Sequence, residues 1–142
     1  MAAYNKFNIF VQDLGNKVHN LSSDSFKVML TNSAPVATNA VKADLTEIAG
    51  GNGYTAGGNT ASVVSWAQSS GVGKLTLNDP ATWTAAGGSI GPFRYVVLYN
   101  DTPTSPADPL VGWWDYGSSQ TLNAGETFTA DLDGTNGTFT VS

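Results

Sequence analysis

The chain has 142 residues, no cysteine, one histidine and a formal net charge of −5 at pH 7. This length allows one domain with its own core, over 1–142, and the lack of cysteine excludes disulfides, thiolate metal sites and cysteine nucleophiles. The sequence contains no cluster of basic residues, so we expect the protein to bind neither nucleic acid nor an anionic membrane. The sequence shows no secretory signal and no run of about 20 apolar residues, so we expect a soluble protein synthesised in the cytoplasm.

Apolar residues near the N-terminus recur at steps of three and four, which is the helical period. They are Phe7, Phe10, Val11, Leu14, Val18 and Leu21. The pattern predicts a helix over 6–20, with Asn5 available as its N-cap. A rival interpretation makes 6–11 an edge strand, because Phe, Ile and Val also favour sheets. In either case we expect the amphipathic segment 1–22 to pack on the domain or on a neighbouring molecule.

The rest of the chain is dominated by strand and turn patterns. Segment 24–31 alternates like a half-buried strand, 41–49 favours a short helical turn, and the glycine-rich segment 50–58 predicts a loop. Further strand candidates are 60–68, 73–78, 81–86, 93–100, 110–116, 127–132 and 137–141. Turn residues separate them. We therefore expect an all-β fold, an antiparallel β-sandwich or jelly roll of about eight strands with a short N-terminal helix.

Two of these strands, 93–100 and 110–116, carry apolar residues on both faces. Strict alternation groups Phe93, Tyr95, Val97 and Tyr99 on one face of the first strand, opposite Arg94, Val96, Leu98 and Asn100. In the second strand it groups Leu110, Trp114 and Tyr116 on one side, opposite Val111 and Trp113. Such strands need cover on both faces. The cover is either the N-terminal segment, through Phe7, Phe10 and Leu14, or a partner.

No constellation of residues favours catalysis or metal binding over a structural role. The only histidine, His19, is expected to cap the end of the helix. Asp115 and Glu126 are the best candidates for a glycosidase acid and base, but Asp115 is more simply a solvent-side carboxylate. Segment 131–137 resembles a calcium loop in its spacing of oxygen ligands, and a hairpin turn explains it better. We expect no catalytic residue, no cofactor and no metal.

Four tryptophans, Trp66, Trp83, Trp113 and Trp114, are the clearest compositional signal. They could form a sugar-binding platform, or some could fill the core while others anchor a protein partner. Because Trp113 and Trp114 are adjacent in a predicted strand, we expect them to point to opposite faces.

Several segments together resemble a family of small proteins encoded among the structural genes of tailed bacteriophages. They are Lys6-Phe-Asn-Ile-Phe, His19-Asn-Leu with 25–35, Gly51-Asn-Gly-Tyr-Thr-Ala-Gly-Gly, 91–101 and Gly112-Trp-Trp-Asp-Tyr-Gly. The resemblance implies a jelly-roll head cement or decoration protein, located on the outer surface of the capsid in the virion. Such a protein binds the phage major capsid protein at junctions between subunits and is made in the host cytoplasm.

We therefore predict a non-enzymatic virion protein that bridges major capsid subunits and forms a homo-oligomer, a dimer or trimer. Patterning alone suggests the interface residues Tyr4, Phe7, Phe10, Val111 and Trp113. The alternative is a carbohydrate- or host-recognition module of a phage tail or spike, and a small glycosidase ranks last.

Overall fold

The longest strands, β7 (Ile90–Asn100) and β8 (Leu110–Leu122), pair antiparallel inside a five-stranded sheet of order β1-β8-β7-β2-β3. The computed structural model describes residues 2–142 and contains the following other elements. They are β1 (Tyr4–Lys6), α1 (Ile9–Gly15), β2 (Phe26–Thr31), the 3₁₀ helix η1 (Lys42–Asp44), β3 (Asn59–Ala61), β4 (Val63–Ser69), β5 (Val72–Leu77), β6 (Trp83–Thr84), β9 (Thr127–Phe128) and β10 (Phe139–Val141). The predicted all-β, antiparallel fold with one short helix is confirmed.

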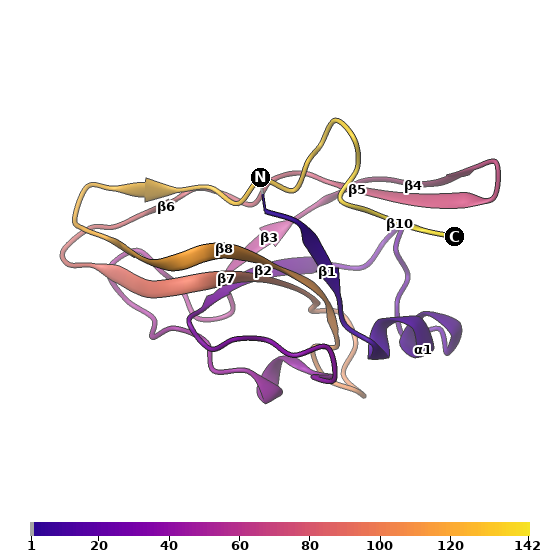
Figure 1. The fold of residues 1–142 in the computed structure, drawn as a ribbon, viewed down its shortest axis with the longest axis horizontal. Helices are drawn as coiled ribbons and strands as arrows, with labels where there is room; N and C mark the ends of the chain where they lie inside the picture. The colour runs from indigo at the N-terminus through magenta and orange to yellow at the C-terminus, as the bar shows by residue number, and fades with distance from the viewer. Residues whose placement is uncertain (1) are drawn as a thin grey trace.

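A second layer covers one face of this sheet. It contains the three-stranded sheet β10-β5-β4 and the short pair β6-β9 (Figure 1). The main core between the layers includes Phe26, Phe93, Trp83, Trp114 and Leu75, all 0–1% exposed. The β4–β5 hairpin reaches beyond the body of the molecule at the right of Figure 1.

The N-terminal segment contains both a strand and a helix. β1 pairs with β8, with Tyr4 opposite Trp114 and Lys6 opposite Gly112. Gly112 permits this because a Cβ there would overlap the Tyr4 ring. The helix begins only at Ile9 and ends at Gly15, so the prediction of a helix over 6–20 was too long at both ends. Pairing with β8 holds residues 4–6 extended, and beyond Gly15 the chain turns at Lys17, whose φ is 63°.

Three register shifts between β7 and β8 interrupt the predicted alternation. One leaves Val111 as an extra residue between the pairs Leu98–Gly112 and Tyr99–Leu110. Val111 therefore faces the main core together with Trp114, while Leu110 shares the other face with Trp113. Two further shifts flank Phe93, between Ile90 and Phe93 and between Phe93 and Tyr95, and Phe93 faces the main core. The predicted grouping was wrong for Phe93, Leu110 and Val111, whereas Trp113 and Trp114 do point to opposite faces.

The second face of the five-stranded sheet has its own apolar cluster, which we call the outer cluster. Its buried members are Phe7, Met29, Val97, Tyr99 and Leu110, with Ile9, Leu45 and Trp113 packed against them. Cover thus comes from within the chain, from the β1–α1 junction and from Leu45, which follows η1. Of the three predicted lid residues only Phe7 lies here, because Phe10 and Leu14 join the main core.

Candidate functional site

The predicted interface residues fall into two groups. Phe7, Phe10 and Val111 are 0%, 1% and 0% exposed, so they belong to the interior and the prediction of an exposed interface does not hold for them. The reasons are the extra residue at Val111 and the packing of α1 against the main core. Tyr4 and Trp113 are half-buried. The Tyr4 ring stacks on Phe139 with centroids 5.2 Å apart, and Trp113 packs against Phe7.

His19 is buried in a hydrogen-bonded network at the end of β7. The side-chain nitrogen of Asn100 donates to Nδ1 of His19 at 3.0 Å and to the Asp24 carboxylate at 2.7 Å. Burial lowers the pKa of His19 to about 4, although the charge of Asp24 opposes this shift. The residue lies beyond the end of α1, so the expected helix cap is wrong. The network instead ties the 16–24 segment to the sheet.

The two carboxylates considered for catalysis both have structural partners. Asp115 accepts two hydrogen bonds from Arg94, at 2.7 and 3.0 Å, and one from the Gly117 N–H. The Arg94 guanidinium holds the pKa of Asp115 below its usual value. Glu126 accepts a hydrogen bond from the backbone of Asn123 at 2.8 Å, which closes a turn. Each carboxylate therefore accepts hydrogen bonds that stabilise its own part of the fold.

The calcium-like segment forms a turn. Asp133 accepts a hydrogen bond from the Asn136 N–H at 2.9 Å, and Asp131 accepts one from the Asp133 N–H. These bonds agree with a local turn, but the predicted hairpin is wrong, because β9 pairs with β6 and β10 pairs with β5, in two different sheets. Within residues 2–142, no group of three or more His, Cys, Asp or Glu side chains is placed to hold a metal ion.

The tryptophans mostly serve the interior. Trp83 and Trp114 are each 1% exposed, and Trp66 and Trp113 are half-buried. Trp66 lies over Gly73 of the neighbouring strand, where a Cβ would overlap its ring. In the described part of the chain, no aromatic side chain is among the large exposed apolar residues. The arrangement gives little support to a sugar-stacking platform.

The glycine-rich loop is held in place by a buried polar cluster. Tyr54 Oη donates to Glu47 at 2.7 Å, and it accepts a hydrogen bond from the Leu30 N–H at 3.1 Å. Glu47 also accepts a hydrogen bond from the Gly57 N–H and pairs with Lys42 at 3.1 Å. Burial raises the pKa of Tyr54, so its hydroxyl stays protonated. Tyr54 thus anchors the loop to β2, and the sequence pattern did not single out its partners Glu47 and Lys42.

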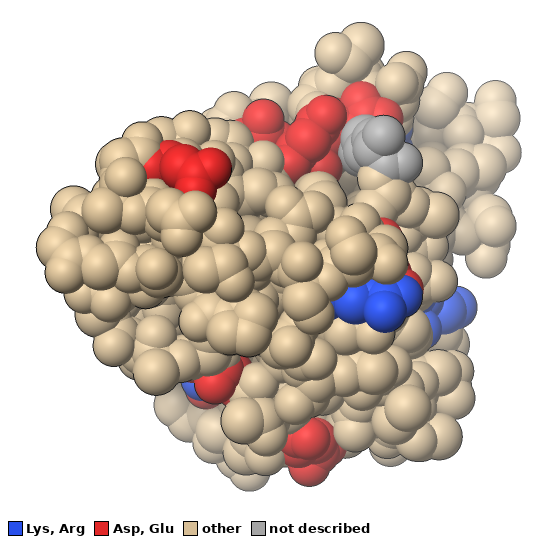
Figure 2. Space-filling model, turned by 60° about the vertical axis from the view of Figure 1, so that its left-hand side comes forward, with Lys and Arg blue, Asp and Glu red and all other residues tan. Residues whose placement is uncertain are grey.

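Four uncharged segments meet at the end of the molecule that holds this loop. They are 32–33, 48–53, 86–92 and 117–121, and we call their shared surface the neutral end. Direct contacts join them, because Ser119 donates to Asn32 at 2.9 Å and Asn52 donates to the Ser89 carbonyl at 3.0 Å. Figure 2 turns the left-hand side of Figure 1 forward and shows broad areas without acidic or basic residues between separate charged patches.

A shallow depression of about 230 Å³ lies within the neutral end. Its lining comes from three of the four segments, with Asn32, Ile48 and Pro92 among the residues, together with Thr46 and Glu47. Since Lys42 pairs with Glu47, the only charged side chain in the lining is neutralised. The result is a surface of amides, hydroxyls and small apolar groups. Such a surface can meet another protein without removing unpaired charges from water.

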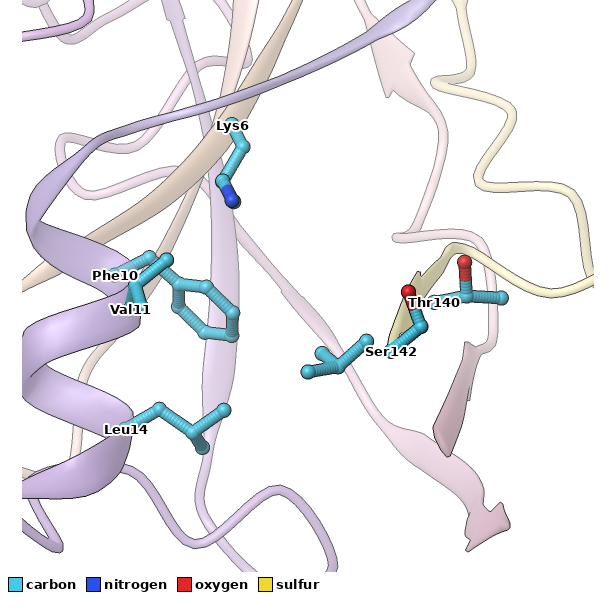
Figure 3. Close-up of a pocket in the computed structure, with 7 residues that line it drawn as sticks. Lys6, Phe10, Val11, Leu14, Thr140 and Ser142 are labelled. Atoms are coloured by element: carbon cyan, nitrogen blue, oxygen red, sulfur yellow. The ribbon is translucent and has the colours of Figure 1, made fainter. Parts of the chain in front are cut away.

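A second cavity, of about 280 Å³, lies between α1 and the C-terminal strand (Figure 3). Phe10, Val11 and Leu14 line it from the helix, and Thr140 and Ser142 line it from the other side. Lys6 carries the only charged side chain in this lining. The cavity therefore combines an apolar wall with one cationic side chain, and its lining contains no pair of side chains suited to acid–base or nucleophilic catalysis.

The fold and surface define a two-layer, all-β protein with an uncharged end. No protein-family model, curated protein or solved structure matches the chain. The part of the chain that the structure describes contains no helix with the length and apolar character needed to cross a membrane.

Proposed function

We propose that this protein is a non-enzymatic component of a tailed-phage virion that binds the outer capsid shell and bridges major capsid subunits. The observation that carries the proposal is the neutral end, where four segments without a charged residue form one surface. Charge depletion is typical of the centre of protein interfaces. Hydrogen bonds within the chain already join segments of the neutral end, so docking of this surface requires less ordering of its loops. The sequence resemblance to head decoration proteins supplies the partner.

The mechanism is stabilisation by burial across a subunit junction. A copy that touches two capsid subunits must be released from both before they separate, and many copies act on one shell. The carbohydrate-recognition alternative needs exposed aromatic rings, and the half-buried Trp66 and Trp113 support it less. A glycan array tests that alternative directly, since saturable binding would favour recognition over capsid stabilisation.

The test of the site is a matched pair of lysine substitutions in exposed serines. Ser118→Lys places a charge on the neutral end, whereas Ser23→Lys places the same charge in the segment between α1 and β2. We expect Ser118→Lys to weaken binding to heads that lack the protein at least tenfold and Ser23→Lys to bind normally, with equal melting temperatures. Equal binding by both variants would remove the neutral end as the contact.

The cement role has its own test. We expect heads without the protein to break at lower temperature than complete heads, and added protein to restore their resistance. Heads that withstand heat equally well with and without the protein would overturn the role.

A further inference from the structure

The three-stranded sheet ends in an unusually open strand. β4 (Val63–Ser69) lies at the edge of the order β10-β5-β4 and pairs only with β5. Its sequence, Val-Val-Ser-Trp-Ala-Gln-Ser, has no charge and no proline. Folded proteins usually protect such edges with lysine, proline, short length or a bulge, and the only one of these in β4 is an irregularity at its Val63–Ser65 end. Among the described edge strands, β1, β3 and β10 have three residues each, whereas β4 has seven.

The turn at the tip fixes which backbone groups of β4 are free. Ser70 and Gly71 form a two-residue turn with φ values of 52° and 81°, flanked by the pair Ser69–Val72. In such a hairpin the flanking pair exchanges hydrogen bonds, and the bonding alternates along the ladder. Gln68 and Trp66 therefore direct their N–H and C=O groups away from β5. Among the described residues, no hydrogen bond outside the strands uses these backbone groups.

The usable edge is short and centred on Ala67. A register shift between Val63 and Ser65 interrupts the regular ladder at Val64, which leaves 65–69 as the regular part. An antiparallel copy of this stretch, aligned about Ala67, places Trp66 opposite Gln68 of the other copy. Both residues have free backbone groups, so two such pairs form, with hydrogen bonds in each.

We propose that the edge of β4 pairs with the β4 edge of a second copy of this chain, joining two three-stranded sheets into one of six strands. The sequence of β4 suits pairing with a second copy of β4. Pairing about a two-fold axis places each β4 residue of one copy opposite a β4 residue of the other. A charge at the axis position would meet its own copy, and β4 has no charged residue at this or any other position. The small side chain of Ala67 fills the axis position without a clash. This contact is independent of the head-binding surface, since the hairpin carries none of the four segments of the neutral end.

Two pairs of variants test the contact in the full chain. The protein lacks cysteine, so a single introduced cysteine can crosslink only to its copy. At a non-hydrogen-bonded antiparallel pair the two Cα atoms are about 4.5 Å apart, within the range of a disulfide. We expect Ala67→Cys to form a disulfide dimer under mild oxidation at least tenfold faster than Val72→Cys, which lies on the same hairpin but on β5. Equal rates would overturn the proposal.

The second pair uses charge and is read by sedimentation over a concentration series. We expect the unmodified protein to dimerise, Ala67→Lys to weaken the dimer at least tenfold, and Val72→Lys to leave it nearly unchanged. Circular dichroism and melting confirm that each variant is folded. A protein that stays monomeric at all concentrations, or a dimer that Ala67→Lys leaves intact, contradicts the pairing. Binding of Ala67→Lys to phage heads is measured as well. Normal head binding by a monomeric Ala67→Lys protein would show that dimerisation and head binding are independent, so that one can fail without the other.

Discussion

The ring of Trp113 lies 4.5 Å from the ring of Phe7, on the face of the five-stranded sheet opposite the main core. The Phe7 N–H also donates to the Val111 carbonyl at 3.2 Å, so backbone and side chain together fix the β1–α1 junction on β8. The contact completes the outer cluster. Both apolar faces of the five-stranded sheet are therefore covered by other parts of the chain. Trp113 therefore has an internal role, and its exposed part is what remains for a partner.

Replacing Trp113 by alanine should destabilise the protein by about 2–4 kcal/mol, since it removes a large ring from a cluster that cannot fully collapse. Chemical denaturation followed by circular dichroism measures the change, and Trp113→Phe, which keeps an aromatic ring over Phe7, should lose less. A Trp113→Ala protein of unchanged stability that no longer binds heads would show that the residue serves the interface instead.

Removing the hydroxyl of Tyr54 should cost about 1–3 kcal/mol, because it leaves the buried Leu30 N–H without its hydrogen-bond acceptor. Tyr54→Phe also takes a donor from Glu47, which holds the glycine-rich loop. Hydrogen exchange should become faster at the amides of Leu30 and Gly57. Tyr95→Phe is the control, because it removes a hydroxyl from a half-buried tyrosine of β7, the strand that pairs with β2. An unchanged Leu30 exchange rate in Tyr54→Phe would contradict the anchoring role.

The fold class was predictable, while the faces of β7 and β8 were not. Alternation and turn residues place most strands, because these signals are local. A bulge adds one residue without changing the apolar pattern, so Val111 was assigned to the wrong face, and the irregular pairing on both sides of Phe93 is equally invisible in that pattern. At the N-terminus the same apolar residues suit a strand or a helix. The strand conformation of residues 4–6 depends on pairing with the distant strand β8, which the local pattern does not contain.

The neutral end was only partly visible in the sequence. Its four uncharged segments can be read directly, as can the glycines of its loop. Their union depends on contacts between distant residues, such as Ser119 with Asn32, and no local pattern predicts which loops meet at one end of a β fold. The predicted interface instead followed large apolar side chains, and most of those proved to be core.

Gly58 should tolerate no side chain. Its φ is +77°, and a Cβ would overlap the backbone of Val28. Gly51 also has a positive φ, of +122°, but a Cβ there would meet nothing within 4 Å. We expect Gly51→Ala to cost about 1–2 kcal/mol through backbone strain alone, and Gly58→Ala to cost clearly more because β2 and β3 must separate. Thermal melting compares the two, and equal losses would show that the close approach to Val28 is easily relieved.

His19 should make the protein less stable in mild acid. Its pKa falls from about 6.5 in the unfolded chain to about 4 in the folded protein, because burial disfavours the charged ring. The unfolded chain therefore binds more protons between these values, so stability is complete above about pH 6.5 and is lost as the pH falls toward 4, by on the order of 1–3 kcal/mol. His19→Asn keeps an acceptor for Asn100 but cannot titrate.

The matched measurement is the free energy of unfolding of both proteins at pH 7, 5.5 and 4. Asp24 faces His19 through Asn100, and Asp13, whose pKa burial raises, is buried on α1. Asp13 shifts stability in the opposite direction, because its carboxyl group is more readily protonated in the folded state. Both aspartates are present in both proteins, so the difference between the two pH profiles isolates the histidine. We expect the parent to lose more stability than His19→Asn between pH 7 and 4, and parallel profiles would show that the buried ring takes up its proton without cost to the fold.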